Sequence, residues 1–224
     1  MQIETETQLI SIGDRTLRVR PSRSSNPHLL VMLHGWTGDE NSMWTFTHGL
    51  SANTWIMAPR APHAADPSGF SWRPVDQSAF GFPTLDTLAP AAEKLIMLID
   101  EYCASISLNA QQFDIMGFSQ GAAMTNLIGM LYPDRVRKMG VLAGFVPAGL
   151  EELILQKTLT GKNIFVAHGT RDQMIPIDRA RVSMALLEQA GAQITYCEDN
   201  VGHKLSANCL RALERYLSDP HESG

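Results

Sequence analysis

The segment Gly117–Gly121 reads Gly-Phe-Ser-Gln-Gly, with a glycine two residues before and two residues after Ser119. It follows the strand-like Phe113–Met116 and precedes a helical pattern that starts near Ala122. A serine on a sharp strand-to-helix turn exposes its hydroxyl, and small neighbours let the strand and the helix approach closely. The positive end of the helix dipole favours an oxyanion there. We therefore predict that Ser119 is a nucleophile; the alternative is a chance match.

A serine hydroxyl needs a base that removes its proton, and the base is usually a histidine oriented by a carboxylate. On a strand–turn–helix nucleophile the chain order is serine, acid, histidine. Three histidines follow Ser119, namely His168, His203 and His221. His203 lies in a loop after the last expected strand, and Asp172 follows the strand before it. We predict that His203 is the base and Asp172 its orienting acid; the alternatives are a surface-loop histidine and a capping aspartate.

Two backbone N–H groups should stabilise the tetrahedral intermediate. One belongs to the residue after the nucleophile, Gln120, and the other to a loop that follows an earlier strand. That loop is Leu33–Gly38, where Gly35 permits a tight turn that aims the Trp36 N–H inward. The alternative is an ordinary glycine-rich connection. His34 in the same loop is expected to form structural hydrogen bonds and not to serve as a second base.

Short apolar runs alternate with helical patterns along the chain, and such runs are typical of strands covered on both faces. The expected strands are Leu29–Leu33, Trp55–Ala58, Phe113–Phe118, Met139–Phe145, Ile164–Ala167 and Ile194–Cys197. Helices are expected over residues 86–106, 120–131, 176–190 and 205–218. This alternation predicts an α/β fold with a mainly parallel twisted sheet and helices on both faces.

Two β-like runs, Glu4–Ile12 and Thr16–Arg20, open the chain and are joined by Gly13-Asp14, a pair suited to a tight turn. They predict an antiparallel N-terminal hairpin at one edge of the sheet. Ligands of such sheets bind beyond the carboxyl ends of the strands. The candidate residues follow the expected strands, so we expect the site at that edge.

Length and composition limit the other classes of protein. The 224 residues, 44% of them hydrophobic, fit a single domain over 1–224, and the net charge of −5 argues against binding to nucleic acid or anionic lipid. Cys103, Cys197 and Cys209 form no CxxC or Cys/His cluster, so we expect three reduced thiols, no metal site and no cofactor. The N-terminal residues lack a signal-peptide pattern and no apolar run could span a membrane, which favours a cytoplasmic protein.

Several aromatic residues fall in segments expected above the sheet. Among them, Trp36 and Trp72 are the candidates for an apolar substrate pocket. Packing at the edge of the domain is the alternative for each. Arg73 could anchor an anionic substrate, although a solvated arginine is the simpler interpretation. Because the longest insertions, about 60–85 and 147–162, are loop-sized, we expect an open site with no cap domain.

Four segments together resemble a known family. Leu33-His34-Gly35, Gly117–Gly121, His168-Gly-Thr-Arg-Asp172 and Gly202-His203 occur in the order and at the spacings seen in the phospholipase/carboxylesterase family of α/β-hydrolases. That family includes acyl-protein thioesterases and small bacterial carboxylesterases. The resemblance covers about residues 28–217 and implies the α/β-hydrolase fold. It also implies the catalytic roles given above, and it is compatible with a homodimer.

The leading hypothesis is a serine hydrolase that cleaves small-molecule carboxylic esters, thioesters or lysophospholipids through an acyl-enzyme. One alternative is a cofactor-free perhydrolase that uses the same three residues with peroxide. The other is a catalytically silent hydrolase fold that serves as a binding module. Such a module typically lacks one catalytic residue, and none is missing here.

Overall fold

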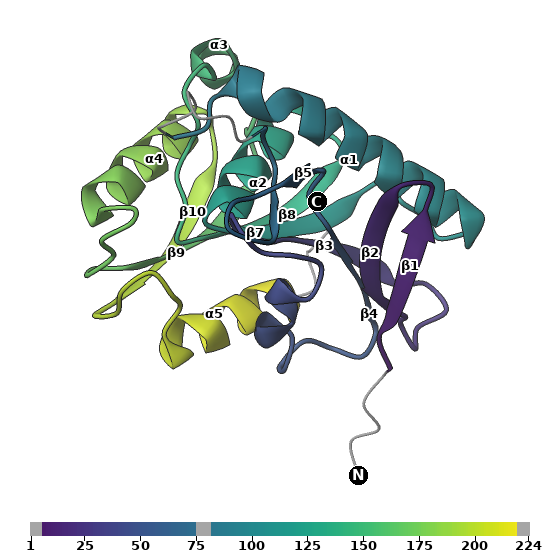
Figure 1. The fold of residues 1–224 in the computed structure, drawn as a ribbon. Helices are drawn as coiled ribbons and strands as arrows, with labels where there is room; N and C mark the ends of the chain where they lie inside the picture. Colours follow the sequence, from purple (N-terminus) through teal and green to yellow (C-terminus); the bar gives the residue numbers. More distant parts are fainter. Residues whose placement is uncertain (1–5, 75–81, 219–224) are drawn as a thin grey trace.

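The computed structural model describes residues 6–74 and 82–218. Its main feature is one eight-stranded sheet with the strand order β1-β2-β4-β3-β7-β8-β9-β10 (Figure 1). The strands are β1 (Gln8–Ile12), β2 (Arg15–Arg20), β3 (His28–Leu33), β4 (Thr54–Pro59), β7 (Phe113–Phe118), β8 (Val136–Leu142), β9 (Asn163–Gly169) and β10 (Gln193–Asp199). The pairs β1–β2 and β2–β4 are antiparallel, and all the other pairs are parallel. The predicted mainly parallel sheet with an N-terminal hairpin at one edge is therefore confirmed.

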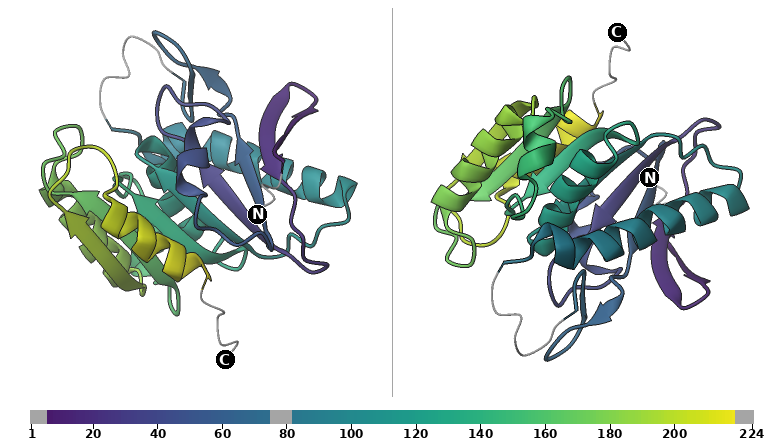
Figure 2. Two further views of the ribbon diagram at one scale, coloured as in Figure 1. Left: turned by 90° about the horizontal axis from the view of Figure 1, so that it is seen from below. Right: turned by 90° about the horizontal axis from the view of Figure 1, so that it is seen from above.

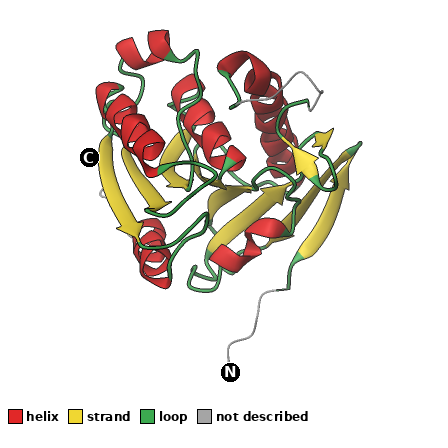
Figure 3. Ribbon diagram, turned by 60° about the vertical axis from the view of Figure 1, so that its left-hand side comes forward, coloured by secondary structure: helices red, strands yellow, loops and turns green. Residues whose placement is uncertain are grey.

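Helices cover both faces of this sheet, as predicted (Figures 2 and 3). One face carries α1 (Leu85–Ser105), α2 (Gln120–Leu131), α3 (Glu151–Leu155) and α4 (Ile177–Gln189). The other carries α5 (Ala207–Ser218) and the short 3₁₀ helix η1 (Ser42–Phe46). The apolar core is accordingly divided into two clusters, one on each side of the sheet.

The central strands are apolar because both of their faces are covered. In β3, five consecutive residues from Leu29 to Leu33 are buried, and β7 is buried from Phe113 to Gly117. Helix α1 instead buries one stripe, which includes Leu88, Leu95 and Ile99. These elements hold the carboxyl ends of the parallel strands at one edge, where the loops with the candidate residues begin.

A small second sheet lies between β4 and α1. It pairs β5 (His63–Ala64) with β6 (Phe70–Ser71) and was not expected from the sequence. Gly38 forms an isolated antiparallel bridge with Phe70, so this sheet is fastened to the loop that follows β3. The insertion at 60–85 therefore contributes a small hairpin to the edge of the site. Its residues 75–81, including the aromatic Phe80, lie outside the described residues.

The cysteines correct one expectation. Cys197 of β10 and Cys209 of α5 form a disulfide, with their Cα atoms 5.6 Å apart, so the prediction of three reduced thiols is wrong. Only Cys103 is a free thiol, and it is buried. The error arose because an odd, widely spaced set of cysteines gives no local sign of pairing. Two of them meet only because α5 folds back across β10.

Within the described residues, no helix has both the length and the apolar character needed to cross a membrane.

Candidate active site

Ser119 occupies the turn between β7 and α2, as the sequence predicts. Its backbone lies at φ 55° and ψ −114°, a left-handed φ that a residue with a side chain rarely adopts. The Ser119 N–H donates to the carbonyl oxygen of Leu142 at the end of β8, at 2.9 Å. The Ser119 carbonyl accepts the N–H groups of Ala122 and Ala123 at 3.0 and 3.2 Å. These bonds hold the turn in a conformation that leaves the serine partly exposed.

The two flanking glycines are required by close backbone contacts. A Cβ atom on Gly121 would lie 2.1 Å from the carbonyl oxygen of Leu33, and one on Gly117 would lie 2.1 Å from the carbonyl oxygen of Gly121. Neither backbone neighbour can move aside without shifting a strand or the helix. The glycines therefore permit the tight packing of β7, α2 and β3 that raises Ser119 at the edge of the sheet.

Asp172 and His203 meet above the ends of β9 and β10. The Nδ1 atom of His203 lies 2.6 Å from Oδ2 of Asp172. The other carboxylate oxygen, Oδ1, accepts the N–H groups of Met174 and Ile175, both at 2.9 Å. Because an ionised carboxylate only accepts hydrogen bonds, this contact assigns the hydrogen to Nδ1 and leaves Nε2 free to accept a proton. The Asp172 side chain is fully buried, whereas His203 is 16% exposed.

Strand order brings this pair toward Ser119. The strands β7, β8, β9 and β10 run parallel and side by side, so the residues that follow them share one edge (Figure 1). The imidazole of His203 packs on the ring of Phe118, with ring centroids 4.9 Å apart. Phe118 immediately precedes Ser119. The structure thus places His203 in contact with the residue that leads into the turn that carries Ser119.

His168 supports Asp172 in a way that the sequence reasoning missed. Its Nε2 donates to the carbonyl oxygen of Ile175 at 2.8 Å and lies 3.5 Å from Oδ2 of Asp172. The side chain is fully buried. It therefore braces the turn that presents the Asp172 carboxylate. The signal that could have found this role is the spacing of four residues between His168 and Asp172.

The loop after β3 lies directly against Ser119. A Cβ atom on Gly35 would be 3.2 Å from Cβ of Ser119. The next two N–H groups along the loop are engaged, because Thr37 donates to the Phe70 carbonyl and Gly38 donates to the Gly35 carbonyl, both at 3.0 Å. The Trp36 N–H has no hydrogen-bond acceptor among the described residues. Trp36 as a whole is 49% exposed. This N–H and that of Gln120 therefore belong to the two segments that flank Ser119.

His34 is a structural residue, as the sequence suggested. Its Nε2 accepts the Ala61 N–H at 3.0 Å, and its Nδ1 donates to the Gly35 carbonyl at 2.7 Å. Only a neutral imidazole can donate from one nitrogen and accept at the other. Burial lowers the pKa of His34, which favours the same neutral form. The ring thereby fixes the start of the loop that carries Trp36.

Gln120 and Trp72 join the small hairpin to the turn that carries Ser119. The Gln120 Oε1 accepts the Trp72 N–H at 2.9 Å, and its Nε2 donates to Oγ of Ser71 at 3.1 Å. The Trp72 indole donates to the His34 carbonyl at 2.8 Å and packs on the His34 ring. Trp72 is only 2% exposed. The structure therefore places Trp72 beneath the Trp36 loop, as a support, rather than at the open surface beside Ser119.

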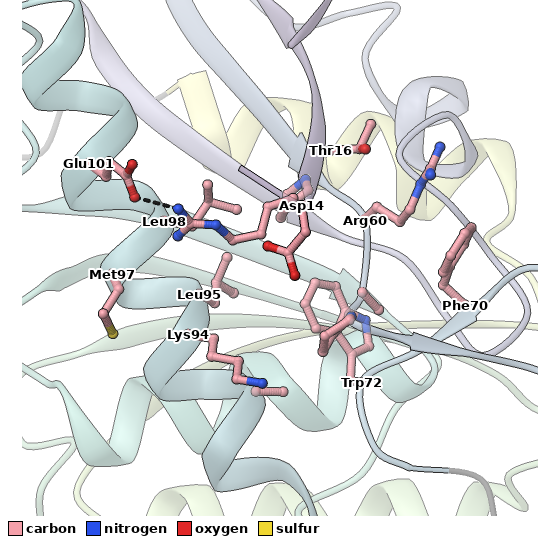
Figure 4. A pocket seen from close by; sticks show the side chains of 15 residues that line it. Asp14, Thr16, Arg60, Phe70, Trp72, Lys94, Leu95, Met97, Leu98 and Glu101 are labelled. Carbon is pink, nitrogen blue, oxygen red and sulfur yellow. Dashed lines mark hydrogen bonds and ion pairs between the residues drawn. The ribbon is translucent and has the colours of Figure 1, made fainter. Parts of the chain in front are cut away.

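A separate pocket of about 480 Å³ opens between α1, the β1–β2 turn and the segment after β4 (Figure 4). Trp72 forms part of its wall, and Asp14, Lys94 and Glu101 contribute charged groups. Ser119, Asp172 and His203 do not line it. Among the described residues there is no cluster of three or more histidine, cysteine, aspartate or glutamate side chains that could hold a metal ion.

Comparison with known proteins adds independent information. The family model described as phospholipase/carboxylesterase matches residues 15–221. A probable carboxylesterase, SOBER1-like, of Arabidopsis thaliana is 27% identical over 76% of this chain and 69% of its own length. Acyl-protein thioesterase 1 of Debaryomyces hansenii is 27% identical and is covered over 98% of its length by 95% of this chain.

Among solved structures, a carboxylesterase from Mesorhizobium loti superposes with a TM-score of 0.79 at 19% identity, over 96% of this chain and 99% of that one. The likeness establishes the α/β-hydrolase fold that the sequence predicted.

Proposed function

Because the chain belongs to the phospholipase/carboxylesterase family, we propose that it is a serine hydrolase that cleaves carboxylic ester or thioester bonds through an acyl-enzyme. The observation that carries the proposal is the 2.6 Å contact between His203 and Asp172, made beside the strained turn that holds Ser119. A nucleophile, a base and an orienting acid on neighbouring parallel strands are the parts that acyl transfer requires.

The reaction proceeds in two half-reactions. In the first, Ser119 Oγ attacks the substrate carbonyl carbon while Nε2 of His203 takes the hydroxyl proton. The carbonyl oxygen becomes an oxyanion that the N–H groups of Trp36 and Gln120 stabilise. Collapse of this intermediate breaks the bond to the leaving group, which departs as an alcohol or a thiol with the proton from His203. An acyl group then remains on Ser119 as an ester.

Water completes the cycle. His203 removes a proton from a water molecule, which attacks the acyl carbonyl, and a second tetrahedral intermediate forms in the same pair of N–H groups. Its collapse releases the carboxylic acid and returns the proton to Ser119. Asp172 keeps the imidazole in the tautomer with hydrogen on Nδ1 and stabilises the imidazolium that forms transiently. The two backbone bonds to Oδ1 fix the carboxylate for this task.

Substrate contacts follow from the exposure of the tryptophans. The half-exposed Trp36 offers an apolar surface for the acyl or alcohol part of a small ester, thioester or lysophospholipid. Trp72 acts on the substrate indirectly, by holding the loop that carries Trp36.

We also propose that residues 1–224 work as one domain. A homodimer and a cytoplasmic location remain predictions, and the Cys197–Cys209 disulfide argues against a reducing compartment.

The proposal is tested with p-nitrophenyl acetate and three single variants, Ser119→Ala, His203→Ala and Asp172→Asn. We expect the first two to lose ester turnover and the third to lose on the order of 10⁴-fold in kcat because the imidazole takes the wrong tautomer. Thermal unfolding of each variant shows whether the fold is intact. Turnover retained by folded Ser119→Ala would refute the proposal, and activity that appears only with peroxide would favour the perhydrolase.

A further inference from the structure

Arg179, in the first turn of α4, packs against two aromatic rings that contact each other. Its guanidinium carbon is 3.5 Å from the ring centroid of Phe82 and 4.7 Å from that of Phe145. The two rings also contact each other edge to face, with centroids 4.8 Å apart. Phe145 is buried, whereas Phe82 is 40% exposed. The two rings therefore hold the guanidinium in place, and Arg179 itself is partly exposed.

This cation lacks an anionic partner among the described residues. No carboxylate forms an ion pair with Arg179, and its Nε is buried with no hydrogen-bond acceptor. The adjacent Asp178 is 89% exposed and lies 3.5 Å from Arg181. Burial lowers the pKa of Arg179, although a guanidinium remains charged at neutral pH. A partly buried charge without a partner is costly, so the site favours an added anion.

Helix α4 strengthens that preference. Its first turn presents the positive end of the helix dipole, where a cation is disfavoured and an anion is favoured. Because Nε is buried, an anion from solvent would meet the terminal Nη1 and Nη2 groups, whose N–H pair matches the two oxygens of a carboxylate or phosphate. Stacking therefore fixes Arg179 where it would otherwise be unfavourable. A bound oxyanion would satisfy both the side chain and the helix end.

One segment links the guanidinium to the turn that carries Ser119. The segment after β8 connects them, because a Cβ atom on Gly144 would be 3.5 Å from the carbonyl oxygen of Ser119, and Phe145 follows directly. The Ser183 hydroxyl donates to the Arg179 carbonyl at 2.8 Å and accepts the Val146 N–H at 2.9 Å. These contacts fix the first turn of α4 against that segment.

The turn that carries Asp172 leads into the same end of α4, since the N–H of Ile175, two residues before the helix, donates to the Asp172 carboxylate. Arg179 therefore lies at the edge of the sheet where the substrate is attacked.

We propose that Arg179 is a specificity-determining residue that binds a carboxylate or phosphate group carried by the ester substrate. This inference rests on the proposed function and adds to it a substrate class, namely esters with an anionic group some distance from the scissile carbonyl. The anion would meet the N–H edge of the guanidinium while the carbonyl lies against Ser119.

The test compares two p-nitrophenyl esters, the hexanoate and the monoester of adipic acid, which differ only by a terminal methyl or carboxylate. Arg179→Met keeps the apolar stem but removes the charge. We expect its kcat/KM for the adipate ester to fall about 10- to 100-fold, the range of a charge-assisted hydrogen bond, while the hexanoate ester changes less than about threefold. Arg179→Lys should retain part of the selectivity. Arg181→Met, two residues along the same helix, is the matched control and should change neither ester.

Competition distinguishes the two anions without requiring turnover of an anionic ester. Adipate and inorganic phosphate are titrated against hydrolysis of p-nitrophenyl acetate by the wild-type protein and by Arg179→Met. Inhibition by one anion that the variant loses supports the inference and identifies the anion.

Equal losses on both esters in Arg179→Met, or no loss on either, would overturn the inference. A wild-type protein that hydrolyses neither ester and matches Ser119→Ala would instead refute the proposed function.

Discussion

Removing the Cys197–Cys209 disulfide should destabilise the protein and loosen the loop that carries His203. The disulfide joins β10 to α5 across a sequence separation of 12 residues, and His203 lies midway between its two ends. Closing a loop of this length in the unfolded chain stabilises the fold by about 3 kcal/mol. For a chain of this size that corresponds to a loss of roughly 6–12 °C in Tm. We expect kcat to fall as well, because His203, the proposed base, is less well fixed.

The assay follows thermal unfolding and p-nitrophenyl acetate hydrolysis in the wild-type protein and in the double variant Cys197→Ala, Cys209→Ala. Each is measured with and without dithiothreitol, a dithiol that reduces the disulfide to two thiols as it becomes oxidised itself. The wild-type protein should lose stability on reduction and approach the double variant, whose Tm the reductant should not change. The reasoning fails if peptide mapping of the oxidised protein finds both thiols free, or if reduction leaves the wild-type Tm unchanged.

Three further outcomes follow from the geometry. Gly121→Ala should unfold the protein or lower its free energy of unfolding by more than about 3 kcal/mol, because the new Cβ would lie 2.1 Å from the carbonyl oxygen of Leu33. Gly202→Ala is the control, because its Cβ would meet nothing closer than 3.8 Å. Urea titration of both variants measures the difference. Gln120→Ala should lower the free energy of unfolding by about 1–3 kcal/mol and also lower kcat, because the buried Trp72 N–H loses its acceptor. Gln120→Glu keeps an acceptor oxygen and should unfold at a higher urea concentration than Gln120→Ala. Burial lowers the pKa of His34, so this side chain is neutral in the folded protein, whereas the unfolded chain takes up a proton below about pH 6.5. The free energy of unfolding should therefore fall as the pH drops below that value. Measured by urea unfolding, its decrease from pH 7.5 to pH 5.5 should be smaller for His34→Gln than for the wild-type protein.

The bounds of strands and helices are predicted best for elements in which nearly every residue is buried. The strand Phe113–Phe118 and the helix over 120–131 have the predicted bounds, because every β7 residue up to Gly117 is buried and the turn that carries Ser119 marks the junction. The strand expected at Met139–Phe145 is shifted and runs over Val136–Leu142. Ala143 takes a positive φ of 46°, which ends the strand although the apolar residues continue.

The start of β8 was missed because it is polar. Arg137 forms an ion pair with Asp114 on the neighbouring strand, at 2.6 Å, and Lys138 donates to the Tyr216 carbonyl at 2.7 Å. Burial of these charged side chains depends on partners far away in the sequence, which an apolar pattern cannot reveal. The same limit applies to the short elements α3, η1, β5 and β6, whose residues show no clear period.

At the candidate site, the types and chain order of the residues were enough to select the candidates. The contacts that hold them in place could not be predicted from the sequence. Ser119, Asp172 and His203 could be selected because acyl transfer needs those side chains after particular strands. The contacts of Gln120 with Trp72 span 48 residues, and Trp72, a candidate for the substrate pocket, is a buried residue that supports the loop after β3. The disulfide likewise joins residues that only the fold of α5 against β10 brings together.

The most direct test of the account is covalent labelling with a fluorophosphonate followed by a crystal structure of the adduct. We expect phosphorus bonded to Oγ of Ser119, the phosphoryl oxygen within hydrogen-bond distance of the Trp36 and Gln120 N–H groups, and Nε2 of His203 facing the same centre. Label on another residue, or a folded protein in which Ser119 does not react, would contradict it.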